Sequence, residues 1–142
     1  MLALLLTTRL LLAGPEWVDP AEFGPWAGVV ECESSGYVRI ENPVSTASGL
    51  FQFLDTTWDW VTADAGRDDL TGSPASEASV SDQYAMALHL RDMPGGGIGH
   101  WECGYRYKRG LADPPVSAFP GFVKFEVLLA PKRYACGPGN FR

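Results

Sequence analysis

The sequence predicts an α+β domain that is mainly helical, with a small hairpin or loop lobe and a C-terminal extension. Helix-start signals recur along the chain, and glycine- and proline-rich breaks separate them. Residues 37–50 instead show turn signals without helical spacing, and residues 123–129 alternate between apolar and charged side chains. The chain has 142 residues, of which 46% are hydrophobic and 20% charged. This composition fits one globular domain and excludes a disordered chain, a collagen or a coiled coil.

Two short helices are expected near the start of the domain. Asp19 is a typical cap residue and Pro20 suits a first helical turn. The dipeptide Gly24-Pro25 breaks this helix, so that a second one begins at about Trp26.

The second helix has an apolar stripe that ends in a carboxylate. Trp26, Val29, Val30 and Glu33 share one face at helical spacing, while Glu31 is rotated toward water. A carboxylate on an inward face is costly unless it has a partner or a task. Residues 34–36 then stop the helix.

Two longer helices follow the lobe. Asp55 is expected to cap a helix that runs to about residue 65, and a polar loop spans 66–79. The next helix runs from about Ser79 to Met93, where Ser79 and Asp82 resemble a capping box. The glycines of 95–97 lack the context of a phosphate-binding loop and indicate a turn.

The chain divides into three parts. Residues 1–14 are apolar with Arg9 inside the run, so a secretory signal and a disordered leader both stay open, and the run is too short to span a bilayer. Residues 15–104 are expected to form the compact domain. Residues 105–142 form the C-terminal extension, expected to dock on the domain or to bind another protein.

Charge and cysteine content limit the partners. The formal charge of −6 argues against a nucleic-acid groove, which usually needs a basic face. The three cysteines are an odd number, so at least one thiol, for example Cys136, is free or pairs with another chain. Zinc bound by the cysteines and His100 is disfavoured because no C-x-x-C spacing is present. No metal or cofactor is therefore expected.

An ordered set of short motifs resembles the transglycosylase-like domain of resuscitation-promoting factors and, more broadly, the lysozyme-like lytic transglycosylases. The set runs over residues 26–104 and comprises Cys32-Glu33-Ser34-Ser35-Gly36, Ser48-Gly49-Leu50-Phe51-Gln52-Phe53, Thr57-Trp58, Gln83, Ala87 and Trp101-Glu102-Cys103.

This resemblance implies a lysozyme-like fold with a saccharide cleft and, as substrate, the glycan strand of bacterial peptidoglycan. It implies that Glu33 is the catalytic acid, that Cys32 and Cys103 form a disulfide, and that Gln52 lines the cleft. The sequence departs from the family pattern at 35–37, where Gly-Gly-Asn is common, and in the extra Phe51.

The chemistry of glycan cleavage supports Glu33 independently. A carboxylic acid protonates a glycosidic oxygen near neutral pH only if its pKa is raised, which apolar surroundings achieve by disfavouring the charged form. A helix-end carboxylate bonded to a hydroxyl or amide is the alternative on position alone. A hydrolase also needs a second carboxylate, for which Asp55, Asp59 and Glu41 are candidates; of these, only Glu41 is expected near a cleft. A lytic transglycosylase needs none, which favours that route.

Several polar and aromatic residues are candidates for substrate binding. Tyr37 follows the acid on a loop, and tryptophan rings can stack on sugars or fill a core. Gln52 either bonds an N-acetyl group or ties the helix of Glu33 to the next loop. The candidate substrate-binding residues are Gln52, Tyr37, Trp58, Trp101 and Glu41.

The predicted function is peptidoglycan cleavage by a lytic transglycosylase or a muramidase. Such an enzyme would be secreted, associated with the cell wall, or carried by a phage as a lysin. The alternative is a non-catalytic wall-binding or virion structural protein on a lysozyme-like scaffold.

Overall fold

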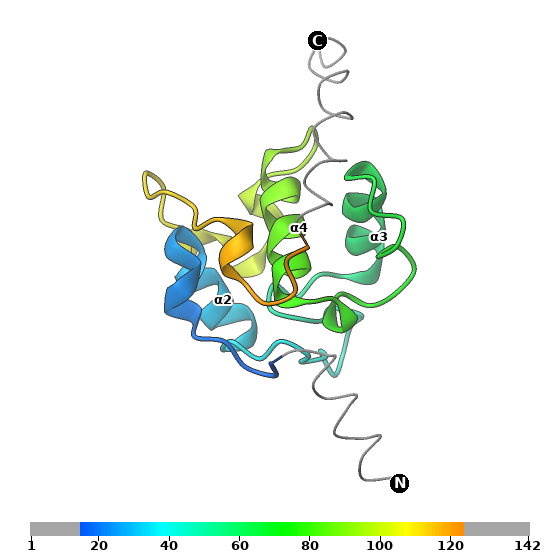
Figure 1. Ribbon diagram of the computed structural model, residues 1–142, viewed down its shortest axis with the longest axis horizontal. Helices are drawn as coiled ribbons and strands as arrows, with labels where there is room; N and C mark the ends of the chain where they lie inside the picture. The colour runs from blue at the N-terminus through cyan, green and yellow to red at the C-terminus, as the bar shows by residue number, and fades with distance from the viewer. Residues whose placement is uncertain (1–14, 124–142) are drawn as a thin grey trace, which may run out of the picture.

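The computed structural model describes residues 15–123, in which helices supply most of the regular structure (Figure 1). Helix α4 lies centrally, with α2 and α3 to either side. In the described part of the chain, β structure consists of single bridges, so the predicted mainly helical class is confirmed. No helix between residues 15 and 123 is long and apolar enough to cross a membrane. The elements are η1 (Pro20–Trp26), α2 (Ala27–Ser34), α3 (Asp55–Asp64), η2 (Ala75–Glu77), α4 (Val80–Asp92), η3 (Ile98–His100), η4 (Glu102–Arg106) and η5 (Val116–Ala118).

The break between the first two helices lies at the predicted position. The Asp19 carboxylate caps η1 by accepting a hydrogen bond from the Ala21 N–H at 3.0 Å. Gly24 has a φ of +57°, a conformation that favours glycine, and a Cβ there would approach Pro114 to 3.0 Å. The kink at Gly24 turns the chain into α2, which begins at Ala27.

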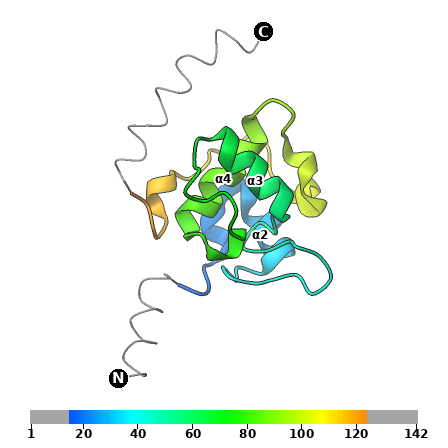
Figure 2. The same ribbon diagram turned by 90° about the vertical axis from the view of Figure 1, so that its right-hand side faces the viewer.

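The lobe between α2 and α3 is a loop with single bridges rather than a regular hairpin. Ser48 pairs with Glu41 on one side and with Phe53 on the other. The Gly49 N–H donates to the carbonyl oxygen of Ile40 at 2.8 Å and closes the base of the loop. Figure 2 shows this segment extending from the body in cyan to teal.

One of the three predicted caps is wrong by one residue. Ser79 caps α4 as expected, because its Oγ accepts a hydrogen bond from the Asp82 N–H at 3.0 Å. At α3 the extended N-cap residue is Leu54, so Asp55 is already helical and its side chain cannot act as the cap. The Asp55 N–H instead donates to Thr46 Oγ1 at 3.1 Å.

Aromatic side chains from distant parts of the sequence form the core. Phe23, Trp26, Phe51 and Tyr84 have no exposed surface. Phe51 contacts Phe23 and Trp26 edge-on, with ring centroids 5.8 Å and 5.5 Å apart. This geometry suits the quadrupoles of aromatic rings and joins η1 to the lobe.

The first part of the C-terminal extension docks on this core. Phe119 stacks on Phe23 with centroids 4.6 Å apart, and the Tyr84 hydroxyl donates to the Pro114 carbonyl oxygen at 2.8 Å. Asp113 forms an ion pair with Arg91 of α4 at 2.8 Å. The leader 1–14, the rest of the extension from 124 to 142 with most of its expected strand, and Cys136 lie outside the described residues.

A buried glutamine on α4 connects the lobe to the helical body. Gln83 has no exposed surface; its Oε1 accepts from the Leu50 N–H at 2.7 Å. Its Nε2 donates to the carbonyl oxygens of Val38 and Ala78, each at 3.1 Å. A Cβ at Gly49 would collide with Gln83 Oε1, so a glycine allows this close approach. The sequence suggested that Gln52 could tie the helix of Glu33 to the lobe, whereas the tie that the structure shows is made by Gln83 and starts from α4.

We expect Gln83→Leu to lower the free energy of unfolding by about 2–4 kcal/mol, because three buried backbone groups lose their hydrogen-bond partner. Urea unfolding followed by circular dichroism measures this change. The matched control is Gln52→Leu, which removes a half-buried glutamine and should cost less than about 1 kcal/mol. Equal losses in the two variants would contradict the role assigned to Gln83.

Candidate active site

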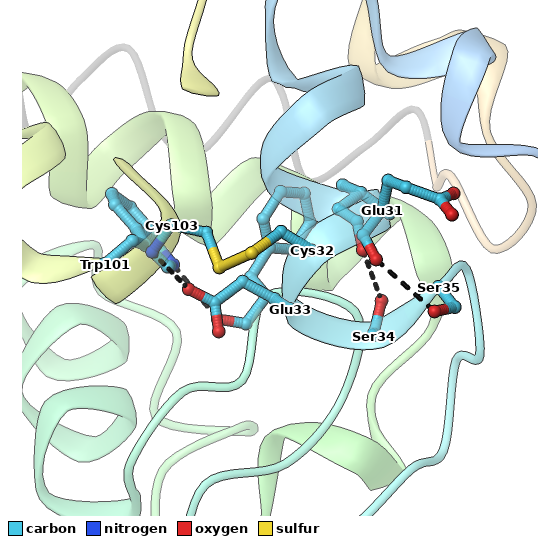
Figure 3. Close-up of a disulfide and its surroundings, with 9 residues drawn as sticks. Glu31, Cys32, Glu33, Ser34, Ser35, Trp101 and Cys103 are labelled. Carbon is cyan, nitrogen blue, oxygen red and sulfur yellow. Dashed lines mark hydrogen bonds between the residues drawn. A yellow bond between two sulfur atoms is a disulfide. The ribbon is translucent and has the colours of Figure 1, made fainter. Parts of the chain in front are cut away.

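A disulfide places η4 against the end of α2 that carries Glu33 (Figure 3). Cys32 and Cys103 are bonded, with Cα atoms 6.1 Å apart, which is the pairing that the family resemblance implied. The Cys103 N–H donates a hydrogen bond to Glu33 Oε1 at 3.1 Å. The cross-link therefore holds the donor in place beside the carboxyl group that follows Cys32 in the sequence.

Glu33 lies at the edge of the core, as its place on the apolar stripe predicted. Trp26, Val29 and Val30 have no exposed surface, Glu33 is half-buried and Glu31 is exposed. Burial raises the pKa of Glu33 and is the largest influence on it. The Cys103 N–H acts in the opposite direction because it stabilises the carboxylate, yet the pKa stays above its ordinary value.

Glu102 is a site residue to which sequence reasoning gave no role. Its negative charge adds to the increase in the pKa of Glu33, because two carboxylates close together resist ionising together. The available signal was its position between Trp101 and Cys103, since a cysteine paired with Cys32 brings its neighbour close to Glu33.

A tight turn at the end of α2 positions two exposed aromatic rings. Ser35 adopts a left-handed conformation, and a Cβ on Gly36 would collide with the Val18 carbonyl oxygen. The next residue, Tyr37, pairs with Trp17 through a β-bridge, and the two side chains are 53% and 51% exposed. Sequence reasoning missed Trp17 because nothing in the sequence links it to Tyr37 before the chain is folded.

Trp58 and Trp101 lie in the core. Trp58 is 1% exposed and its indole N–H donates to the Leu70 carbonyl oxygen at 3.1 Å. Trp58 thus offers no ring face to a sugar, and we correct its expected role from substrate contact to core packing. Trp101 is 6% exposed and donates to the Phe51 carbonyl oxygen at 3.0 Å, and it is also among the residues that line a surface hollow.

Gln52 and Glu41 both belong to the lobe. Gln52 has a φ of +48° and its Nε2 donates to the Gly49 carbonyl oxygen at 3.1 Å, which stabilises its own turn. Glu41 is exposed and pairs through its backbone with Ser48. In the described part of the chain, neither side chain hydrogen-bonds to Glu33.

The other candidate carboxylates have different surroundings. Asp59 Oδ1 accepts a hydrogen bond from the Gly72 N–H at 2.8 Å and so closes the loop after α3. Asp55 Oδ1 is buried without a hydrogen-bond partner among residues 15–123. Over the same residues, no three His, Cys, Asp or Glu side chains gather as metal ligands.

Comparisons with known proteins agree with the resemblance seen in the sequence. The family model described as "Transglycosylase-like domain" matches residues 21–104. A "Probable transglycosylase SceD 2" of Staphylococcus saprophyticus is 42% identical over 67 residues, which are 47% of this chain and 25% of the relative. A "Probable transglycosylase SceD" of Staphylococcus aureus is 40% identical over 73 residues, 51% of this chain and 29% of the relative. No solved structure gives a significant match.

The chain thus spans between a quarter and a third of the length of these curated relatives. The family model, in contrast, covers more than half of the chain and includes Glu33, both bonded cysteines and the lobe. The protein therefore belongs to the transglycosylase-like domain family.

Proposed function

We propose that this domain cleaves the glycan strand of bacterial peptidoglycan, with Glu33 acting first as general acid and then as base. The observation that carries the proposal is a half-buried carboxyl group with a raised pKa, held by the Cys103 N–H at 3.1 Å. Family membership supports transglycosylase chemistry, and two staphylococcal relatives are named probable transglycosylases.

The two oxygens of Glu33 have different surroundings. Oε1 accepts the Cys103 N–H, and no described residue hydrogen-bonds to Oε2. A hydrogen-bond donor stabilises negative charge on the oxygen that it faces, so the proton resides on Oε2. From Oε2 the proton passes to the glycosidic oxygen, and the bond between that oxygen and the anomeric carbon breaks.

The second step uses the carboxylate formed in the first. The anomeric carbon becomes positively charged, and Glu33 removes the proton from the 6-hydroxyl of the same sugar. The hydroxyl oxygen then bonds to the anomeric carbon, which leaves a 1,6-anhydro ring and restores the protonated acid. This route needs no second carboxylate, which agrees with the engagement of Asp59 by the Gly72 N–H. Capture of the cation by water would give the muramidase product.

The residues proposed to contact the sugar lie on either side of the acid in sequence. Trp17 and Tyr37 expose about half of their side chains and can stack on sugar faces. Gln52 and Glu41 supply polar groups from the lobe. The disulfide suits an oxidising compartment, so we propose action outside the cytoplasm, whether the protein is secreted, wall-associated or phage-borne.

Glu33→Gln should lower the rate of glycan cleavage by about 10²- to 10⁴-fold, because the amide cannot donate the proton. Fragments released from purified sacculi are separated and identified by mass spectrometry. Anhydro ends indicate the transglycosylase and reducing ends the muramidase. The control Glu31→Gln, an exposed neighbour on the same helix, should cleave at the wild-type rate. An active Glu33→Gln variant would refute the assignment, and wild-type binding without cleavage would favour the wall-binding alternative.

Cleavage should decline as the pH rises through the raised pKa of Glu33, because only the protonated acid donates. In Glu102→Gln the neighbouring negative charge is removed, so the pKa of Glu33 falls and the decline moves to lower pH. The measurement is kcat/KM against pH for both proteins. An unchanged or higher midpoint in Glu102→Gln would contradict the electrostatic coupling.

Glu33 should also make the fold less stable at neutral pH. Its pKa in the folded state exceeds the unfolded value, so the folded state binds more protons and stability falls as the pH rises between the two values. Glu33→Gln should therefore unfold at higher denaturant than the wild type at pH 7, and the gain should vanish below the ordinary pKa of 4.5. If Glu33→Gln is instead less stable than the wild type at pH 7, the ionised Glu33 does not destabilise the fold and this expectation is wrong.

A further inference from the structure

We propose that the segment 105–109 is an anion-binding subsite that recognises the carboxylates of the peptide stems carried by the glycan. The inference rests on the proposed function, because it names the part of the peptidoglycan that lies beside the cleaved bond. Three cationic side chains, Arg106, Lys108 and Arg109, form this basic loop. In Figure 1 it is part of the yellow segment that projects beyond the blue ribbon of η1.

The basic loop is the exception on an acidic domain. Residues 15–123 carry sixteen acidic and six basic side chains, a formal charge of −10. Arg67 and Arg91 form ion pairs with aspartates, and Arg39 donates to the Ser76 carbonyl oxygen at 2.6 Å. The remaining three basic residues are those of the loop, which are exposed and form no salt bridge within residues 15–123. These cations keep their full capacity to bind an anion.

Backbone contacts fix the loop close to Glu33. Cys103, the second residue of η4, hydrogen-bonds to Glu33, and the helix contacts α2 again at Gly28, where a Cβ would lie 3.0 Å from the Cβ and carbonyl oxygen of Arg106. The Lys108 N–H donates to the Pro25 carbonyl oxygen at 3.0 Å. Residues 28 and 33 are about 8 Å apart along α2 at 1.5 Å per residue. The cations therefore lie within reach of a substituent on a sugar bound at Glu33.

A hollow adjoins the cations. It has a volume of about 250 Å³, and its lining includes Trp101, Tyr105, Tyr107 and Arg109. Tyr105 is 83% exposed, so its ring is open to contact with a ligand. A cationic rim around an aromatic surface suits a short peptide with a carboxylate, because the arginine can bind the carboxylate bidentately and the rings can pack on the peptide.

The subsite also explains how a domain of charge −10 could approach an anionic wall. Long-range repulsion falls off over about 10 Å at 0.1 M salt, so a local cluster of cations can determine which face meets the polymer. The basic loop would then orient the domain with Glu33 toward the glycan.

The test measures binding in the Glu33→Gln background, so that the polymer stays uncut. Sacculi freed of phosphate polymers with hydrofluoric acid are pelleted with this protein and with the same protein carrying Arg106→Ser, Lys108→Ser and Arg109→Ser. We expect the triple substitution to raise Kd at least 10-fold. On sacculi whose carboxylates have been converted to methylamides, the two proteins should differ less than twofold. The protein with the intact loop should also lose more affinity as the salt concentration rises.

Two controls separate a local subsite from net charge. Thr56→Glu, Ala63→Glu and Ser73→Glu lower the charge by the same three units at exposed positions elsewhere and should change Kd less than twofold. Arg106→Lys with Arg109→Lys keeps the charges but loses the bidentate geometry, so it should bind more tightly than the triple serine variant and more weakly than the intact loop. If the triple variant is less stable than the protein with the intact loop, the same comparison of Kd is made with the single substitution Arg109→Ser.

Several results would overturn the inference: equal loss in the charge-matched control, a difference that persists on methylamidated sacculi, or a difference that requires the phosphate polymers. Absence of glycan fragments from the wild type would instead refute the proposed cleavage, because the binding comparison does not depend on catalysis.

Discussion

The hydrogen bond from the Cys103 N–H to Glu33 Oε1 is the contact around which the site is organised. It joins two segments that are far apart in the sequence, and the disulfide to Cys32 keeps them together. In the chain-entropy account, a cross-link that closes so long a loop contributes about 4 kcal/mol. The covalent link thus stabilises the fold and fixes the donor whose direction distinguishes the two oxygens of the acid.

Opposing influences set the ionisation of Glu33. Burial against the core and the charge of Glu102 raise its pKa, while the Cys103 N–H lowers it. Burial alone would make the anion costly and slow the step in which the carboxylate acts as base. The Cys103 N–H stabilises the Glu33 carboxylate, so in the proposed mechanism the same side chain can donate a proton and then accept one. In the proposed mechanism, this balance is the physical basis on which a single acid works without a carboxylate partner.

The surroundings of the acid depend on contacts made far from it. Gln83 joins α4 to the lobe through three buried hydrogen bonds. Phe119 stacks on Phe23 and brings part of the extension into the core. The basic loop lies between the site and this docked part, so the proposed catalysis, the packing and the proposed recognition of peptide stems share one stretch of chain.

The sequence alone determined the helical class, the kink at Gly24, the cap at Ser79 and the place of Glu33 at the end of an apolar stripe. These features depend on neighbours within one or two turns, where spacing and backbone preference decide the outcome. Only the tertiary structure decided that Trp58 is core and that Glu102 acts on the acid. It likewise showed that Gln83 rather than Gln52 ties the lobe to the body and that Trp17 pairs with Tyr37 through a β-bridge. Burial and charge interactions depend on which distant segments meet, and spacing along the chain carries no information about that.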